Sequence, residues 1–542
     1  MTATPREMLP ALGSPRLGRL AGAAILLSAS FVLSRILGVV RMSVIAAVFG
    51  NSREIAAYFA AFRIPDAMFM LVSGGALASA FVPMFAGMVE RHEEEAAWRM
   101  ANTVLTGVLV ALAAMAAVSF LFAPQMMGFL VGSGGTGGSG FTPAQRSLTI
   151  DLTRIMLLQP IFLGASAIVS SILQTYHRFL PTAIAPLLYN VAVIVGALLA
   201  PRFGVAALAW AVVAGALVQL VLQVPGMFPE ARGALHISFD WQLPAAREVL
   251  RLFGPRVVGL AAFQAMLFIT LFLAARIPGI NAVNAINYSW PIIQFPVGAL
   301  GMAAGTAIFP TLARLTSAED VAAVQRTVNR SLRIILFLSV PATVGLVVLR
   351  RPIVNLLYAH GSSWGIAATE ETAFALLFYA LALAPLTAIE VLARLFYALR
   401  DTVTPVRIAV VAVIIDAVLS ILLVHVLPSA SGQGGLALAT AIATSVQVIW
   451  LAIVANQRLG TIGLTSIQGT LRDSAIASLA MGLALYVALA PLTAVLPQRG
   501  LGVLITVVIE VALGGATFAA ASYLLGAPEL WQLRALVQRR SS

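Results

Sequence analysis

The sequence predicts an all-α, polytopic membrane protein with about 14 transmembrane helices. The first observation is composition: 60% of the 542 residues are hydrophobic and only 10% are charged, whereas a soluble domain averages about 25% charged residues. The second is that the apolar residues gather in runs of about 20 or more, the helical length that crosses a ~30 Å hydrocarbon core. The alternating segments of about 10 residues that build membrane β-barrels do not occur in the sequence.

Fourteen apolar segments can be delimited. They are 21–48, 55–88, 101–124, 149–175, 181–200, 204–226, 250–275, 283–312, 333–349, 372–398, 405–427, 434–456, 474–496 and 501–526. The first, second, eighth and tenth are long, and each holds a glycine, a proline or a charge near its middle. We therefore expect these four spans to be bent or interrupted.

Composition also excludes several classes of function. The chain has no cysteine, so disulfides and thiolate chemistry are absent, and all 33 basic residues are arginine, which excludes a Schiff-base or P-loop lysine. The five histidines form no metalloprotease motif, and no nucleophile-elbow serine motif occurs. We expect a transporter and not an enzyme, with no transition metal and no cofactor other than Na+ or H+ as a coupling ion.

The arginines also predict the orientation. With the N-terminus in the cytoplasm, 21 arginines fall in cytoplasmic segments, 7 in external segments and 5 within spans. This bias follows the positive-inside rule and predicts that both termini are cytoplasmic, which requires an even number of spans. It also explains the net charge of +12 without nucleic-acid binding. The glycine- and serine-rich stretch 131–145 is then an external loop.

An internal repeat divides the chain. "SAFVPMFA" at 79–86 matches "TAIFPTLA" at 306–313, an offset of 227 residues that covers six predicted spans. Two six-helix lobes related by a pseudo-twofold repeat are the plan of many secondary transporters. The predicted organisation is a cytoplasmic N-terminus 1–20, N-lobe 21–226, cytoplasmic linker 227–249, C-lobe 250–456, C-terminal helices 474–526 and cytoplasmic tail 527–542.

Two arginines lie inside the first span, in "SRILGVVRMSVIAAVFG". A charge at the bilayer centre costs about 2.5–3.5 kcal/mol or more, so water or a partner must meet Arg35 and Arg41. Guanidinium groups match phosphate oxygens in pairs and do not deprotonate, which makes a lipid pyrophosphate a natural ligand. The alternative is structural: either side chain could extend to an interface or cap the carbonyls of a broken helix.

Other charges inside spans have structural explanations beside functional ones. Arg63 and Asp66 flank Pro65 and could neutralise each other at a helix break. Glu390 and Arg394, four residues apart, are expected to form an internal pair.

Three acids remain. Arg400 and Asp401 form a cytoplasmic corner in which turn formation and helix capping are the expected role. Asp416 lies in mid-span with Ser420 on the same helix face. It could bind a hard cation, carry a proton, or be a protonated structural residue. Glu510 is a lone acid in the last span.

Four stretches resemble the MurJ/MviN family of lipid II flippases, within the multidrug/oligosaccharidyl-lipid/polysaccharide exporter superfamily. They are "LSRILGVVRMSVIAAVFG", "AAYFAAFRIPDAMFMLVSGGALASAFVPMF", "INYSWPIIQFPVGALGMAAGTAIFPTLARL" and "RLFYALRDTVTPVRIAVV". The resemblance runs from about residue 20 to the end. It implies two lobes around a central cavity and two extra C-terminal helices. It also implies transport of the undecaprenyl-linked peptidoglycan precursor across the bacterial cytoplasmic membrane, with membrane lipids and cell-wall synthesis enzymes as partners.

The resemblance also implies roles for individual residues. The cavity arginines of the first span fall on Arg35 and Arg41, and we add Arg63 to this candidate pyrophosphate-binding set. The last two spans correspond to a groove for the lipid tail, which is where Glu510 lies. The family can bind sodium between its spans 7, 11 and 12, and the matching positions are Thr270, Asp416, Ser420, Thr440 and Thr444.

The sequence departs from the family pattern where charge is usual. Met42 and Ala56 stand at positions that are usually acidic, and Phe69 and Pro291 stand at positions that are usually arginine. Gln294 replaces a further acid. Much of the usual charged cavity is therefore missing, although the scaffold motifs remain.

The favoured function is a lipid II flippase that works by alternating access. Three alternatives stay open: a flippase for another polyprenyl-linked glycan, a cation-coupled drug exporter, and a non-transporting scaffold of a cell-wall complex. Arg35 and Arg41 count against export of apolar cations, and the missing cavity charges keep the scaffold in consideration.

Overall fold

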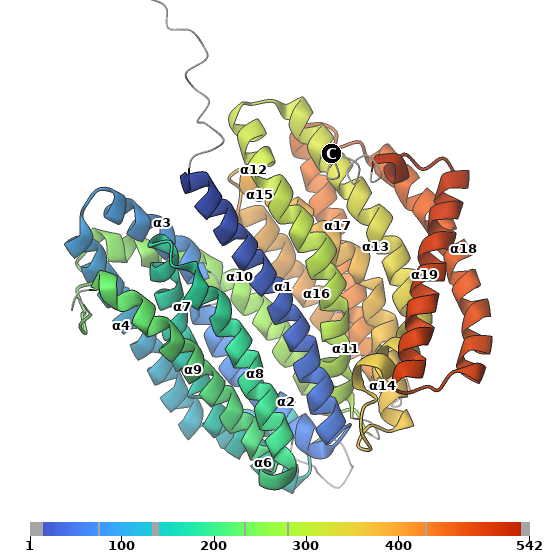
Figure 1. The fold of residues 1–542 in the computed structure, drawn as a ribbon, viewed down its shortest axis with the longest axis horizontal. Coiled ribbons are helices and arrows are strands. Elements are labelled where there is room, and N and C mark those ends of the chain that lie inside the picture. Colours follow the sequence, from blue (N-terminus) through green and yellow to red (C-terminus); the bar gives the residue numbers. More distant parts are fainter. Residues whose placement is uncertain are drawn as a thin grey trace, which may run out of the picture. The chain divides into compact units, whose positions relative to one another are not determined.

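The computed structural model describes residues 15–73, 76–132, 140–231, 235–278, 281–428 and 431–532. Across these ranges the chain is helical and holds no β-strand, which confirms the predicted fold class (Figure 1). The first ten helices are α1 (Pro15–Phe49), α2 (Arg53–Ser73), α3 (Ala76–Glu90), α4 (Glu94–Leu121), α5 (Ala123–Val131), α6 (Pro143–Met156), α7 (Gln159–Thr175), α8 (Phe179–Phe203), α9 (Ala206–Ala231) and α10 (Pro244–Ala274).

The second half of the chain is built in the same way. Its elements are α11 (Ala282–Pro296), the π-helical segment η2 (Val297–Met302), α12 (Ala303–Ser317), α13 (Val321–Tyr358), α14 (Ile366–Leu381), α15 (Leu383–Ala398), α16 (Val403–Val426), α17 (Gly432–Leu459), α18 (Leu464–Val495) and α19 (Leu501–Leu524).

The predicted spans coincide with these helices. Among the described residues, 12 helical stretches are long and apolar enough to cross a membrane. Helices α14 and α15 form one more span, bent by 42°. The remaining predicted span, 250–275, lies on α10, in which 259–274 is a shorter apolar helix. The chain is thus a multi-pass membrane protein.

Two of the four expected interruptions are present: the eighth span contains η2, and the tenth breaks at Ala382. In the second span, the junction of α2 and α3 at residues 74–75 lies outside the described residues. The first span is not interrupted, because α1 is one continuous helix, and a bend within it stays a prediction. Its arginines and glycines keep their backbone N–H groups, and only proline removes one from the helix ladder. A break that we did not predict separates α6 from α7, just before Pro160.

The chain contacts define two compact units. The first comprises Met1–Arg41, Ile64–Phe122 and Leu152–Val257, and the second comprises Met42–Arg63, Ala123–Asp151 and Val258–Ser542. These units are defined by contacts and not by the order of the spans. The predicted lobe boundaries at residues 226 and 250 therefore stay a prediction. Helix α5 belongs to the second unit, where Arg276 donates to the carbonyls of Phe129 at 2.6 Å and Leu130 at 2.8 Å.

In the first unit, α7, α8 and α9 pack closely. Gly196 of α8 lies so close to Ala211 of α9 that a Cβ atom would overlap it. Polar side chains join α7 to α9: Ser166 donates to Gln223 at 2.8 Å, and Gln219 donates to Ser166 at 3.0 Å. Small residues and interhelical hydrogen bonds are the means by which helices associate where the hydrophobic effect is weak.

In the second unit, α13 is the central element, and its 38 residues span about 57 Å at 1.5 Å per residue. The Asp320 side chain caps it by accepting from the Ala323 N–H at 2.9 Å. One apolar cluster joins α13 to α12, α15 and α17, with Leu332, Leu395 and Leu451 buried in it.

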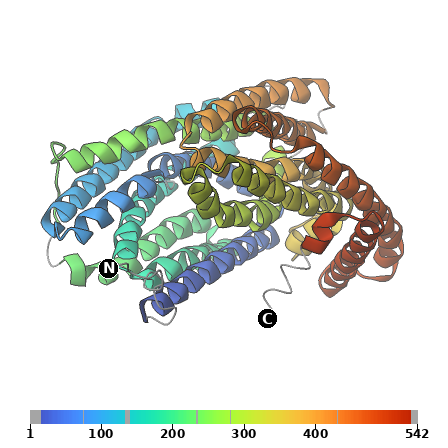
Figure 2. The ribbon, with the colours of Figure 1, turned by 90° about the horizontal axis from the view of Figure 1, so that it is seen from above.

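Helices α18 and α19 form a C-terminal pair that packs on α13 (Figures 1 and 2). Phe337 of α13 and Phe518 of α19 meet with ring centroids 5.0 Å apart. Beyond α19, the buried Glu529 carboxylate receives Arg333 of α13 at 2.5 Å and the Thr470 hydroxyl of α18 at 2.6 Å. This ion pair joins the chain that follows α19 to α13.

The tight turn between α1 and α2 depends on Gly50. It has φ of +56°, and a Cβ atom there would overlap the Ser363 carbonyl. Its own carbonyl accepts from the Tyr288 hydroxyl at 3.0 Å.

We predict that Gly50→Ala lowers the free energy of unfolding by at least ~2 kcal/mol, because left-handed backbone strain adds to the overlap. Gly38 is the matched control, since a Cβ atom at this α1 position meets nothing within 4 Å. Gly38→Ala should stabilise the protein by about 0.5–1 kcal/mol. Thermal unfolding in detergent measures both changes; equal melting temperatures for the two variants would contradict the role assigned to Gly50.

Candidate functional site

Arg35 and Arg41 are half-buried on α1. Helix α1 is held to α8 by the Ser30 hydroxyl, which donates to the Ala183 carbonyl, and by Asn190, whose amide donates to Ser34 at 3.4 Å. The Arg35 guanidinium lies 5.1 Å from the centroid of the Phe31 ring. A cation–π contact of this kind lowers the free-energy cost of holding the guanidinium charge inside the span.

Arg41 lies in a polar group of the first unit. The charges of Arg41 and of Asp66 both act on the Tyr189 hydroxyl. This hydroxyl also accepts a hydrogen bond from the Gln159 amide at 3.0 Å. Helices α1, α2, α7 and α8 thus bring a cation, an acid and two neutral hydrogen-bonding groups together. The sequence offered no charge to mark Tyr189 or Gln159, so neither was predicted.

Arg63 lies in a corresponding polar group of the second unit. Its guanidinium donates to the Asn287 side-chain oxygen of α11 at 3.0 Å. The charges of Arg63 and Asp416 both act on the Tyr379 hydroxyl of α14. The Tyr379 ring packs edge-on against Trp290, with centroids 5.2 Å apart. Arg63 and Asp416 therefore share one tyrosine, which sequence spacing could not show.

Asp416 is buried, with 2% of its surface exposed. The Thr440 hydroxyl of α17 interacts with its carboxyl, although that hydroxyl also donates to the Leu436 carbonyl at 3.3 Å. Among the described residues, neither Asp416 oxygen has a hydrogen-bond partner of normal geometry. Ser420, one turn further along α16, is 1% exposed. A carboxyl in this setting needs a proton or a cation.

Two other residues of the candidate cation set bond within their own helices. The Thr270 hydroxyl donates to the Met266 carbonyl at 2.9 Å, and the Thr444 hydroxyl donates to the Thr440 carbonyl at 2.8 Å. The structure brings Asp416 and Thr440 together; the ligand roles of the whole set stay a prediction. In the described part of the chain, no group of three or more His, Cys, Asp or Glu could hold a metal ion.

The turn after α1 carries a polar network that sequence analysis missed. The Asn51 amide donates to Glu371 of α14 at 2.7 Å, and its side-chain oxygen accepts from Asn284 of α11 at 2.8 Å. Asn281 donates to the Asn51 backbone carbonyl at 2.6 Å. Asparagines in turns are common, so the sequence alone could not single these out.

Two structural pairs were predicted correctly. Arg394 and Glu390 form an ion pair at 3.3 Å. Asp401 accepts from the Val403 and Thr404 N–H groups at 3.0 Å, which is the capping role expected of it.

Glu510 is fully buried in α19, and within the described chain neither of its carboxyl oxygens has a hydrogen-bond partner. Its role at a lipid-tail groove stays a prediction.

The positions that depart from the family pattern are buried or half-buried. Ala56 is 0% exposed and Met42 is 8% exposed. A carboxylate at either place would need a compensating partner. Phe69 and Pro291 are half-buried.

A membrane-embedded fold of apolar helices, with arginines and an acid held inside its spans, defines a polytopic α-helical transport protein. Comparison with known sequences gives the particular family. The profile described as "Lipid II flippase MurJ" matches residues 45–497. This chain belongs to that family, which confirms the resemblance found in the sequence.

Individual relatives agree. The lipid II flippase MurJ of Burkholderia cenocepacia is 32% identical over 393 residues, which cover 71% of this chain and 74% of the relative. A probable lipid II flippase MurJ of Rhizobium tropici is 30% identical over 430 residues, 78% of this chain and 79% of the relative.

Solved structures share the fold. "Lipid II flippase MurJ, inward closed conformation" superposes with a TM-score of 0.74 at 21% identity, over 92% of this chain and 98% of that one. An inward-facing multidrug resistance MATE family transporter of the MOP superfamily gives a TM-score of 0.65 at 15% identity, over 82% of this chain and 99% of that one.

Asp401 and Asp416 are expected to respond in opposite directions to replacement by asparagine. Burial raises the pKa of Asp401, but the hydrogen bonds from Thr404 and Val403 and the charge of Arg458 outweigh it and lower the pKa overall. Arg458 lies 2.6 Å from its carboxylate. The carboxylate therefore stabilises the protein at neutral pH, and this contribution is lost as the pH falls through its lowered pKa.

Asp401→Asn should thus lower the melting temperature at pH 7, and the difference should shrink as the pH falls through the lowered pKa of Asp401. Asp416→Asn should raise the stability by about 1–3 kcal/mol in sodium-free buffer, because the neutral amide avoids the cost of burying a carboxylate charge or of protonating it. Thermal unfolding in detergent at several pH values measures both. A destabilised Asp416→Asn protein would show that the carboxyl is fully satisfied in the native state.

Proposed function

We propose that this protein is a lipid II flippase of the bacterial cytoplasmic membrane, working by alternating access of its two lobes. The observation that carries the proposal is Arg41 in the middle of the first span, grouped with Tyr189 and Asp66, in a chain of the MurJ family. The relatives with this name are lipid II flippases. A transporter role also fits the absence of catalytic motifs in the sequence.

The proposed ligand of the arginines is the pyrophosphate of the lipid-linked precursor. A guanidinium group keeps its charge at any physiological pH and can donate two parallel hydrogen bonds to phosphate oxygens. Arg35 and Arg41 are half-buried, so they are partly removed from competing water. Because acids or arginines usual in the family are replaced at Ala56, Phe69 and Pro291, these two side chains carry a larger share of anion recognition.

The proposed orientation places both termini in the cytoplasm. The distribution of 21 cytoplasmic against 7 external arginines supports it. In this orientation the Asn51 network, which ties the turn after α1 to α11 and α14, lies at the external end of the spans. Cell-wall synthesis enzymes are the proposed partners that supply and consume the lipid-linked substrate.

Asp416 is the proposed site of ion coupling. Its buried carboxyl can hold Na+ with hydroxyl groups such as those of Ser420 and Thr440, or it can hold a proton. Tyr379 supports a link to the substrate, since the charges of Asp416 and Arg63 both act on its hydroxyl. Occupancy of Asp416 would change the field at Arg63 and thereby bias the carrier between its states.

The substrate role is tested in a host depleted of its own flippase, by following exposure of lipid II on the outer leaflet. Arg41→Ala should lower the flipping rate at least about tenfold, because a charge-assisted contact to phosphate is lost. Arg202→Ala, at an exposed arginine near the end of α8, is the control and should flip normally. Wild-type protein that is well expressed and exposes no lipid II would favour another lipid-linked glycan or a scaffold role.

The coupling ion is tested by thermal shift. If Na+ binds at Asp416, sodium should raise the melting temperature of the wild type by an amount that grows as the logarithm of its concentration. Potassium at equal ionic strength should have no such effect, and Asp416→Asn should abolish the sodium response. A sodium response that persists in Asp416→Asn would place the ion elsewhere. The absence of any sodium response, with proton-dependent flipping lost in Asp416→Asn, would identify a proton as the coupling ion.

A further inference from the structure

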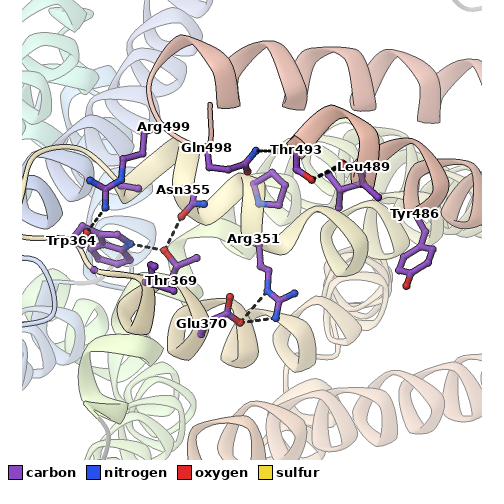
Figure 3. A pocket seen from close by; sticks show the side chains of 15 residues that line it. Arg351, Asn355, Trp364, Thr369, Glu370, Tyr486, Leu489, Thr493, Gln498 and Arg499 are labelled. Atoms are coloured by element: carbon purple, nitrogen blue, oxygen red, sulfur yellow. Dashed lines mark hydrogen bonds and ion pairs between the residues drawn. The ribbon is translucent and has the colours of Figure 1, made fainter. Parts of the chain in front are cut away.

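A cavity with both polar and apolar walls lies outside the groups described above, at the end of the second unit where α13 and α18 end and α14 and α19 begin (Figure 3). Its volume is about 740 Å3. Its walls come from α13, the loop and first turn of α14, the last turns of α18, and the turn that leads into α19. The C-terminal helix pair and the C-lobe therefore share it.

The lining has an excess of one positive charge. It contains two arginines, Arg351 and Arg499, and one acid, Glu370. Arg351 is neutralised, since its Nε and Nη2 donate to Glu370 at 3.0 and 2.7 Å (Figure 3). Arg499 donates to the Trp364 backbone carbonyl at 3.2 Å. A guanidinium has five N–H donors, and within the described chain Arg499 has no acidic partner. It is the charge in the cavity that an anion could meet.

An apolar stripe leads from the membrane-spanning surface into the cavity. Leu479, Leu483 and Tyr486 of α18 are 74%, 65% and 72% exposed, and they follow one another at i, i+4 and i+7 on one helix face. The same face continues through Ala490 to Thr493, which line the cavity. From Leu479 to Thr493 the helix rises about 21 Å. One leaflet of the hydrocarbon core is about 15 Å thick, so the stripe can lie along one acyl chain.

We propose that this cavity binds the phosphodiester head group of an anionic glycerophospholipid. Arg499 would hold the phosphate, the Thr493 hydroxyl could hydrogen-bond the glycerol, and one acyl chain would lie on the stripe of Leu479, Leu483 and Tyr486. The charge matches, because a phosphodiester carries a single negative charge and the lining a single excess positive one. A pyrophosphate would leave negative charge unpaired, and free phosphate would leave the stripe unused.

Such a lipid would join the C-terminal pair to the C-lobe. The head group would touch both the turn before α19 and the end of α13, which line the cavity from different sides. Bound lipid would thus stabilise the folded protein, because any ligand that binds only the native state does so. The site depends only on the second unit, and the proposal does not rest on lipid II transport.

The test uses the full chain purified in detergent, with phosphatidylglycerol, phosphatidylcholine or inorganic phosphate added. Native mass spectrometry counts bound lipid, and thermal unfolding follows the stabilisation. We expect phosphatidylglycerol to bind and to raise the melting temperature, phosphatidylcholine to bind at least about tenfold more weakly, and inorganic phosphate to have no effect. Equal binding of both lipids would overturn the proposal, and so would a stabilisation by phosphate equal to that by phosphatidylglycerol.

Two variants test the position of the site. Arg499→Gln should weaken phosphatidylglycerol binding about tenfold or more. Ala490→Trp should do the same without changing any charge, by filling the cavity from an exposed position of α18. Arg202→Gln, at an exposed arginine that is not among the cavity-lining residues, is the matched control and should bind as the wild type does. Undiminished phosphatidylglycerol binding in Ala490→Trp would overturn the proposal even if Arg499→Gln fails to fold.

Discussion

The structure is organised by the cost of placing charge inside a membrane. A charged side chain in mid-span costs several kcal/mol unless a partner, water or a ligand meets it. The charged side chains described above have different kinds of neighbouring group. Arg394 pairs with Glu390, Arg63 reaches Asn287, and Arg41 and Asp66 act on Tyr189. Asp416 and Glu510 are the exceptions, since neither carboxyl has a normal hydrogen-bond partner in the described chain.

This contrast separates structural charges from functional ones. Charges that neutralise each other along one helix, as Glu390 and Arg394 do, need nothing further. Arg41 and Arg63 reach groups on other helices, since Arg63 donates to Asn287 and the charge of Arg41 acts on Tyr189. A guanidinium has five N–H donors and can also bind an anionic ligand. A buried carboxyl without a partner retains capacity for a cation or a proton. The proposed transport cycle uses these two capacities, one in the substrate path and one in ion coupling.

The same cost explains which predictions succeeded. The spans were found because about 20 apolar residues are needed to cross the membrane, and that requirement is written locally in the sequence. Capping by Asp401 and the pair Glu390–Arg394 involve residues only a few positions apart, so spacing was sufficient. No interruption occurs in α1, because charge and glycine do not remove a backbone hydrogen bond, whereas proline does. Tyr189, Tyr379 and Asn51 were missed because neutral residues give no signal until distant helices meet.

The sequence by itself determined the class of this protein, its helices, its repeat and its family, because hydropathy, glycine and proline positions and short motifs act over single turns and spans. Only the tertiary structure decided which charges share a neighbour. It placed Arg63 and Asp416 around one tyrosine although they are 353 residues apart in the chain. It also formed the cavity of Arg499 from helices that are separate in sequence. The physical reason is that electrostatic and hydrogen-bonding energies depend on distances in space, which local patterns do not specify.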